Sequence, residues 1–213
     1  MGTSTGNLYG PVNGKVGNLV HYVLGKKNVV RIIGEIHKPA SVGQLACRQE
    51  LKVTVTFLNP IIGFINAGFL SVALHADKKP HNMAVSYNKK HALQGVYPDL
   101  SIDYPKVFVA QGGLRKAENA AVVPVPGGLK FTWNADVLSA SEKSQRVMMM
   151  AYLPDLGVAV YNIQGATRAE GADVLAVKDA FATAYVETYI SFISIPGNDV
   201  ADSMYTGSIH APE

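Results

Sequence analysis

Two groups of basic side chains are the residues whose types and spacing best fit a binding chemistry. Lys26, Lys27 and Arg31 form the first group, and Lys89 and Lys90 form the second. Lys and Arg neutralise phosphate and release its counterions, as in proteins that bind nucleic acid or acidic glycans. Paired lysines also occur at exposed turns and protected sheet edges, and no helix-turn-helix, zinc-finger or RNA-recognition pattern accompanies these. The five residues are therefore candidate anion-binding residues.

Aromatic side chains in the second half of the sequence suggest another kind of site. Tyr161 and Tyr205 stand near the ends of predicted strands, and exposed aromatic rings stack on sugars. Trp133 is instead expected in the core, because it shares one face of an alternating run with Leu129 and Phe131. The sequence thus proposes Tyr161 and Tyr205 as candidate glycan-stacking residues.

Catalytic and metal-binding motifs are not recognisable in the sequence. The stretch GPVNGKVG, residues 10–17, differs from a Walker-type loop in two ways. Three residues, instead of four, separate its first glycine from the Gly-Lys pair, and Val16 follows the lysine instead of Ser or Thr. Cys47 has no evident partner base, and the histidines lack C-x-x-C or H-E-x-x-H spacing. We expect a non-catalytic protein with no cofactor and no metal.

A hairpin and three helices are expected to carry the basic groups. The turn signal GKKN at residues 25–28 lies between apolar and β-branched runs, which predicts two strands at 15–24 and 28–34. Helical patterns follow over 42–60, 61–74 and 81–93. The predicted inward residues are Val42, Leu45, Ala46, Val53 and Phe57 on the first helix and Ile61, Ile62, Ile65 and Phe69 on the second.

The remainder of the chain is predicted to be an antiparallel β-sandwich. Seven short apolar runs alternate with turn clusters, over 120–125, 129–133, 146–153, 157–163, 172–177, 184–194 and 199–205. We therefore expect an α+β protein with two domains, a basic hairpin-plus-helices region at 1–103 and an acidic sandwich at 104–213.

Charge is unevenly distributed along the 213 residues. Up to Lys116 the chain has 14 Lys and Arg against 5 Asp and Glu, a net charge of +9, and from Ala117 onward it has 5 against 11, a net charge of −6. Such asymmetry favours head-to-tail self-association or contact between the halves of one chain. Nucleic acid is a further candidate partner of the basic half.

Composition also bears on where the protein is expected. The chain has one cysteine, and its N-terminus has neither a basic start nor an apolar core, which predicts a cytoplasmic protein. Export or a place in a phage-derived assembly is the alternative. No uninterrupted apolar run of about 18 residues is present, so membrane insertion is not expected.

Several stretches resemble one known family across nearly the whole chain. They are GKVGNLVHYVLGKKNVVR, QLACRQELKVTVTFLNPI, NMAVSYN, YPDLSIDYPKVFVAQGGL, QGATRAEG and ISFIS. In this order they are similar to an uncharacterised family of Bacteroidetes proteins, a domain of unknown function. The resemblance implies a hairpin and helical N-terminal region followed by an immunoglobulin-like or fibronectin-type sandwich. It implies no activity, cofactor or catalytic residue.

The sequence therefore favours a non-catalytic structural or protein-interaction module, with self-association as one expected mode. A binding protein for an anionic polymer, acting through the basic half, is one alternative. An enzyme whose site is assembled from residues without a recognisable motif is the other.

Overall fold

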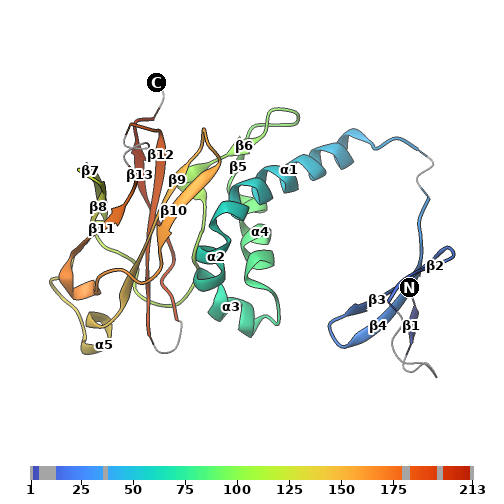
Figure 1. Cartoon of the computed structure of the whole chain (residues 1–213), viewed down its shortest axis with the longest axis horizontal. Helices are drawn as coiled ribbons and strands as arrows, with labels where there is room; N and C mark the ends of the chain where they lie inside the picture. Colours follow the sequence, from blue (N-terminus) through green and yellow to red (C-terminus); the bar gives the residue numbers. More distant parts are fainter. Residues whose placement is uncertain (1, 5–12, 36–37, 179–182, 196–198, 212–213) are drawn as a thin grey trace. The chain divides into compact units, whose positions relative to one another are not determined.

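The computed structural model describes residues 2–4, 13–35, 38–178, 183–195 and 199–211. The chain divides into two compact units, Met1–Val42 and Gly43–Glu213, which we call the N-terminal and C-terminal units. Both contain antiparallel sheets, and helices are part of the second, so the protein is of the mixed α+β class (Figure 1). The predicted domain boundary between residues 103 and 104 lies inside the C-terminal unit.

The N-terminal unit is a four-stranded antiparallel sheet with the strand order β1-β4-β3-β2. Its strands are β1 (Gly2–Ser4), β2 (Gly14–Val16), β3 (Leu19–Leu24) and β4 (Lys27–Ile32). The predicted hairpin is present as β3 and β4, which are joined by the two-residue turn Gly25-Lys26. Gly25 has a φ of 62°, a conformation that glycine adopts without steric cost and that tight hairpin turns require.

The predicted single strand over 15–24 is wrong. Val16 pairs with Leu19, so Gly17 and Asn18 form a second two-residue turn that separates β2 from β3. Gly17 has a φ of 59°. A Gly-Asn pair is a known hairpin signal, and it outweighs the continuous apolar character of the run. Residues 10–12 of the GPVNGKVG stretch lie outside the described residues.

The C-terminal unit has three layers, in which helices and a three-stranded sheet cover the two faces of a four-stranded sheet (Figure 1). The helices are α1 (Val42–Leu58), η1 (Asn59–Ile61), α2 (Ile62–Gly68), α3 (Leu70–His75), α4 (Pro80–His91), η2 (Tyr104–Lys106), α5 (Ala140–Lys143) and η3 (Arg168–Glu170). The four-stranded sheet has the order β10-β9-β12-β13, with strands Val158–Asn162, Arg146–Leu153, Val186–Ile193 and Met204–Ile209. The three-stranded sheet has the order β11-β8-β7, with strands Ala172–Ala176, Gly128–Thr132 and Ala121–Val125, and β5 (Leu93–Gln94) pairs with β6 (Ser101–Ile102).

The four-stranded sheet of the C-terminal unit has a hydrophobic core on each of its two faces, as the side chains of β9 show. Its side chains alternate between the faces, because successive residues of a strand point in opposite directions. Met148, Met150 and Tyr152 pack with the helices. Val147, Met149, Ala151 and Leu153 pack with the three-stranded sheet. All eight residues of β12 are buried, so β12 is covered on both faces.

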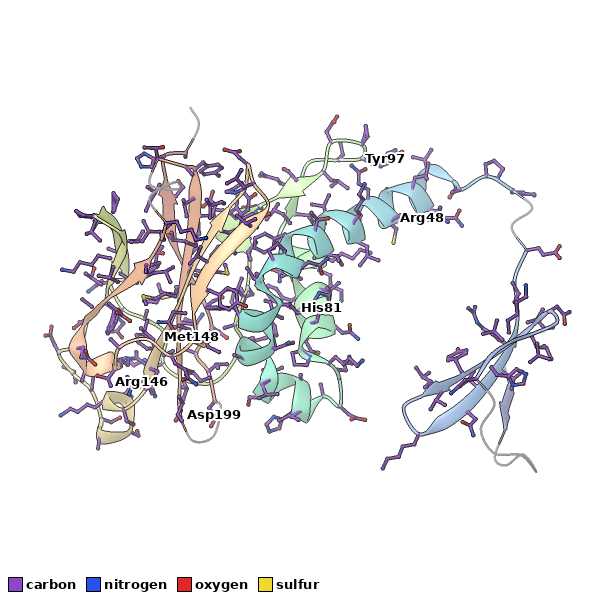
Figure 2. The ribbon with its side chains drawn as sticks, in the orientation of Figure 1. Arg48, His81, Tyr97, Arg146, Met148 and Asp199 are labelled. Atoms are coloured by element: carbon purple, nitrogen blue, oxygen red, sulfur yellow. The ribbon has the colours of Figure 1, made fainter. Side chains whose placement is uncertain are left out.

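Helix α1 is buried only in its second half. Phe57 and Leu58 lie in the helix-facing core, whereas Val42 is 70% and Leu45 is 37% exposed. The prediction that Val42 and Leu45 face inward is therefore wrong. Arg48 lies on this exposed half, and Figure 2 shows its side chain on the outer turns of α1.

The predicted helix over 61–74 is divided into α2 and α3 at Phe69, whose φ and ψ of −114° and 8° are not helical. Ile61, Ile65 and Phe69 are buried as predicted, but Ile62 is 47% exposed. Gly68 ends α2 where the chain passes close to it, since an added Cβ would lie 2.6 Å from the Val109 carbonyl oxygen. A side chain at position 68 would separate the helix from this segment.

One helical stretch, Val42–Gly68, is long and apolar enough to cross a membrane by length and composition alone. Core helices of soluble proteins have the same property. In this unit Phe57, Leu58, Ile61, Phe64 and Ile65 of the stretch pack against the four-stranded sheet.

Six of the seven predicted runs contain the strands β7 to β12, apart from one residue at the start of β8. The seventh run, 199–205, is wrong in its bounds, because β13 begins at Met204 and continues to Ile209. Gly207 and its polar neighbours resemble a turn in the sequence. In the sheet, however, the Thr206 hydroxyl donates a hydrogen bond to the Thr188 hydroxyl across the strands at 2.7 Å, beside a register shift in β12.

Candidate functional site

The N-terminal sheet presents two faces of different chemistry. Residues paired directly across an antiparallel sheet share a face, and alternate residues lie on opposite faces. The pairing therefore defines an apolar face, which consists of Val16, Leu19, His21, Val23, Asn28, Val30 and Ile32. It also defines a basic face, which consists of Lys15, Val20, Tyr22, Leu24, Lys27, Val29 and Arg31.

Very little of this sheet is buried. Among the described side chains of β2, β3 and β4, only Val29 is buried, with 3% exposure. On the apolar face Val16 is 57%, Val23 is 46% and Ile32 is 67% exposed. These side chains form an exposed apolar patch, whereas the buried Val29 lies on the basic face.

The basic face gathers three cations beside an aromatic ring. Lys15, Lys27 and Arg31 share it with Tyr22, and the Arg31 guanidinium carbon lies 6.0 Å from the centre of the Tyr22 ring. No Asp or Glu occurs in β2, β3 or β4. Of the predicted hairpin cations, Lys15, Lys27 and Arg31 share this face and Lys26 lies at the turn, and the binding of an anion by them stays a prediction.

The second predicted basic pair belongs to a different unit. Lys89 and Lys90 are on α4, in the C-terminal unit, whereas Lys26, Lys27 and Arg31 are in the N-terminal unit. Lys89 already has partners, because its Nζ lies 3.2 Å from Cys47 Sγ and 3.2 Å from Glu50 Oε2 of α1. The hydrogen bond to Cys47, followed by that to Glu50, raises the pKa of Lys89. Lys90 is exposed.

The two candidate glycan-stacking tyrosines take part in the packing of the C-terminal unit. Tyr161 of β10 meets Phe64 of α2 edge to face, with ring centres 6.0 Å apart, and keeps 36% exposure. An added Cβ at Gly63 would lie 2.3 Å from the Tyr161 hydroxyl, so the helix fits closely against this ring. The Tyr205 hydroxyl donates a hydrogen bond to Glu187 at 2.6 Å. Stacking of either ring on a sugar stays a prediction.

A buried carboxylate with tyrosine partners lies on the helix-facing side of β12. Glu187 is 3% exposed, and it accepts hydrogen bonds from the hydroxyls of Tyr185 and Tyr205. Burial, and then the charges of nearby groups including Glu187, raises the pKa of Tyr104 to about 12. Burial and the hydrogen bond to Glu187 raise the pKa of Tyr205 to about 12. At neutral pH both phenols are therefore protonated, and the Tyr205 hydroxyl donates its proton to the hydrogen bond with the buried Glu187 side chain.

Sequence reasoning did not identify this carboxylate site. The alternation of Tyr185, Glu187, Tyr189 and Ser191 was visible, but an alternating polar face is usually exposed on an antiparallel sheet. Here the helices and η2 cover that face, and the Tyr189 hydroxyl donates to the Tyr104 carbonyl oxygen at 2.8 Å.

Arg168 is a second buried charge that the sequence did not reveal. It is 1% exposed, and its guanidinium donates to the carbonyl oxygens of Arg115 at 2.8 Å and Lys116 at 2.7 Å. It also donates to Gln145 at 2.8 Å and lies 4.3 Å from the centre of the Phe192 ring. Burial lowers the pKa of Arg168. These hydrogen bonds therefore hold residues 115 and 116 against η3, the element that contains Arg168.

The described residues contain no group of three or more His, Cys, Asp or Glu side chains that could hold a metal ion. Several histidines and carboxylates have other partners. His75 Nδ1 lies 2.7 Å from the Ser71 carbonyl oxygen, and His91 packs on Tyr87. Asp202 forms an ion pair with Lys116 at 3.2 Å.

Comparison with protein families identifies a match over most of the chain. A family model described as a family of unknown function, DUF6266, matches residues 11–207. The chain belongs to this family. No curated protein and no solved structure matches the chain.

The DUF6266 match extends over both units, from the residues before β2 to Gly207 in β13. The predicted resemblance to a domain of unknown function is confirmed in this respect. The basic and apolar faces of the N-terminal sheet, the Glu187 site and Arg168 all lie within the matched residues.

Proposed function

We propose that this DUF6266 protein is a non-catalytic interaction module whose docking element is the N-terminal sheet. The supporting observation is the burial of the sheet: Val29 alone is buried among the described side chains of β2 to β4, while Val16 and Ile32 are more than half exposed. Exposed apolar patches of this kind mark interaction sites on soluble proteins.

The size of the unit supports the same proposal. Units of about 40 residues rarely build a sufficient core, and they usually depend on disulfides, metals or association with another surface. Residues 1–42 contain no cysteine, which removes the disulfide route. The described residues contain no metal-binding group of side chains. Association is the remaining route.

Amide hydrogen exchange on the full chain tests this function. We expect the amides of β3 and β4 in a dilute sample to exchange at least about 100-fold faster than those of β9 and β12, because the sheet has almost no core of its own. Protection of β3 and β4 should rise when the partner surface is supplied. Equal protection of both units in dilute monomer would show that the sheet needs no partner, and would overturn the proposal.

A second candidate function is binding of an anionic polymer by the basic face. Lys15, Lys27 and Arg31 share this face with Tyr22, and the N-terminal unit has 5 Lys and Arg against 1 Glu. A positively charged surface with an aromatic ring is typical of sites for single-stranded nucleic acid.

Fluorescence anisotropy with a labelled single-stranded oligonucleotide tests the second candidate. The slope of log affinity against log salt should fall by roughly 0.7 for each cation removed, so Lys27→Glu with Arg31→Glu should weaken binding and flatten the slope. Lys130→Glu with Lys143→Glu, which reverses two exposed cations of β8 and α5, is the control matched in net charge. Equal loss in the control would mean that binding depends only on net charge.

We also propose that the seven strands from β7 to β13 follow the fibronectin-type sandwich arrangement. The support is the division into three and four strands, with β10 beside β9 rather than beside β11. The helices on the outer face of the larger sheet are an addition to that arrangement.

A further inference from the structure

We propose that a depression at one end of the three-stranded sheet binds a neutral sugar, either free or as one unit of a glycan. The depression is lined by residues 119, 132–136 and 171, and its volume is about 470 Å³. It lies where β8 ends at Thr132, beside the first residues of β7 and β11. The site goes beyond the proposed function, because it belongs to the C-terminal unit and does not involve the N-terminal sheet.

Hydrogen bonds between the lining segments fix the shape of the depression. The backbone N–H of Trp133 donates to the Gly171 carbonyl oxygen at 3.0 Å. The backbone N–H of Asn134 donates to the Glu118 carbonyl oxygen at 2.8 Å, and the Trp133 indole donates to the Arg168 carbonyl oxygen at 2.7 Å. The depression is thus formed before any ligand binds, as the sites of small ligands usually are, and its volume is within their range of about 300–1,000 Å³.

The side chains that line the depression combine hydrogen-bond donors with acceptors. Asn119 has an amide, Thr132 a hydroxyl and Asp136 a carboxylate, and no hydrogen bond within the described part of the chain uses these three groups. The Asn134 Oδ1 accepts from the backbone N–H of Asp136 at 2.8 Å, which leaves its NH₂ group as a donor. Sugar hydroxyls both donate and accept hydrogen bonds, so this mixed set of groups matches them.

Charge favours an uncharged ligand. Among the described residues that line the depression, none is Lys or Arg, and Asp136 would repel a phosphate or a carboxylate. A single carboxylate also compensates little of the charge of a metal ion, and the described residues contain no group of three or more His, Cys, Asp or Glu side chains that could hold one. A neutral polyhydroxy compound therefore fits this site better than an anion or a metal ion.

Trp133 lines the depression and is the only Trp of the chain. Its ring is 5% exposed and packs edge to face on Phe192, with ring centres 5.6 Å apart. The ring is therefore held in one place and offers a ligand only a small apolar contact. Its indole N–H gives a single signal in a ¹⁵N NMR spectrum, so displacement of this signal reports binding at the depression.

NMR titration of the full chain with the methyl glycosides of glucose, galactose, mannose and N-acetylglucosamine tests the proposal. A monosaccharide has few non-hydrogen atoms, so we expect one of these sugars to bind with a dissociation constant of about 1–10 millimolar. Asn119→Gly and Thr132→Val each remove one polar group from the depression. Each should weaken binding about five- to tenfold, because one hydrogen bond to the sugar is lost.

The control variant is matched in backbone conformation. Asn119 and Asp77 both have a φ of 50°, which glycine adopts without strain. Asn119→Gly and Asp77→Gly should therefore disturb the fold equally little, but only the first removes a group from the depression. Valine is well suited to a strand, so Thr132→Val should also fold, and circular dichroism should show that all three variants do.

The result expected is a saturable shift of the indole signal that Asn119→Gly and Thr132→Val weaken and Asp77→Gly does not. A tetrasaccharide of the same sugar distinguishes the two sources of the ligand, because tighter binding than that of the methyl glycoside indicates a glycan and equal binding indicates the free sugar. No shift with any of the methyl glycosides up to about 100 millimolar overturns the inference. A shift that all variants share equally also overturns it, because the sugar would then bind elsewhere or only non-specifically.

Discussion

The N-terminal and C-terminal units each contain a four-stranded antiparallel sheet, but the two sheets differ in what covers them. In the C-terminal unit all eight residues of β12 are buried between helices and a second sheet. In the N-terminal unit only Val29 is buried among the described side chains of β2, β3 and β4. The sheet of the C-terminal unit is thus covered on both faces by its own unit, whereas the described side chains of the N-terminal sheet are mostly exposed, which is the difference on which the proposed docking function rests.

Net charge separates the two units as well. Residues 43–213 contain 14 Lys and Arg against 15 Asp and Glu, whereas residues 1–42 contain 5 against 1. The basic excess of the chain is therefore carried by its N-terminal unit. The predicted division into a basic and an acidic half places the helices with the basic part, but these helices pack on the sheet of the sandwich.

The largest effect is expected from a core substitution in the C-terminal unit. Phe131→Ala removes a ring that is 0% exposed in the core between the two sheets, and we expect a loss of about 3–5 kcal/mol of unfolding free energy. Val174→Ala, at a 47% exposed position of β11, should change it by less than about 0.5 kcal/mol. Urea unfolding followed by circular dichroism measures both. A similar loss in the two variants would contradict the assigned core.

A somewhat smaller loss is expected when the buried carboxylate is replaced. Glu187→Leu leaves the hydroxyls of Tyr185 and Tyr205 without their acceptor, which should cost about 2–4 kcal/mol. Glu187→Gln keeps an acceptor oxygen and should cost less. Equal unfolding free energies for the two variants would show that the hydrogen bonds do not stabilise this unit.

Alkaline pH should destabilise the C-terminal unit through the same tyrosines. The pKa of Tyr205 is raised to about 12 in the folded chain, against about 10 in an unfolded one. The folded state therefore holds this proton more tightly, so its contribution to stability is complete below pH 10 and is lost as pH rises to about 12. Tyr205→Phe should make the unfolding free energy fall less steeply over this interval, and an unchanged slope would contradict the assignment.

The smallest effect is expected at the turn of the N-terminal sheet. Gly25→Ala places a side chain at a φ of 62° and should weaken the sheet by about 1 kcal/mol, seen as roughly fivefold faster amide exchange in β3 and β4. Gly34→Ala is the control, because an added Cβ there has open space and no positive φ is required. The unfolding of the C-terminal unit should be unchanged in both variants. A shift of that transition by Gly25→Ala would mean that the two units unfold together.

Local patterns predicted most of the elements but not the way they are layered. The apolar run over 146–153 and the GKKN turn signal correspond to β9 and the β3–β4 hairpin, because both signals depend on residues close in sequence. Burial of Val42, Leu45 and Ile62 was predicted wrongly, since helical periodicity does not tell which turns of a helix meet another layer.

The candidate site was predictable only in part. Lys15, Lys27 and Arg31 were identifiable from their types, but their common face depends on the pairing of β2 with β3 through the overlooked Gly17-Asn18 turn. The apolar face could not be predicted for the same reason. A shift of one residue in strand pairing moves each side chain of a strand to the opposite face, so the face is defined only once the turn and the pairing are known. Glu187 and Arg168 are buried by segments distant in sequence, and no local pattern records such contacts.

The central position of β12 has a consequence for synthesis of the chain on the ribosome. Residues 42–91, which form α1 to α4, are synthesised early, but the face on which they pack is completed only when residues 186–193 have been made. Until then β9 lacks its neighbour on one side, and the apolar faces of the helices and of β8 have no common sheet between them. The nascent C-terminal unit must therefore remain open, with its aggregation-prone surfaces accessible to chaperones, until nearly the whole polypeptide has left the ribosome.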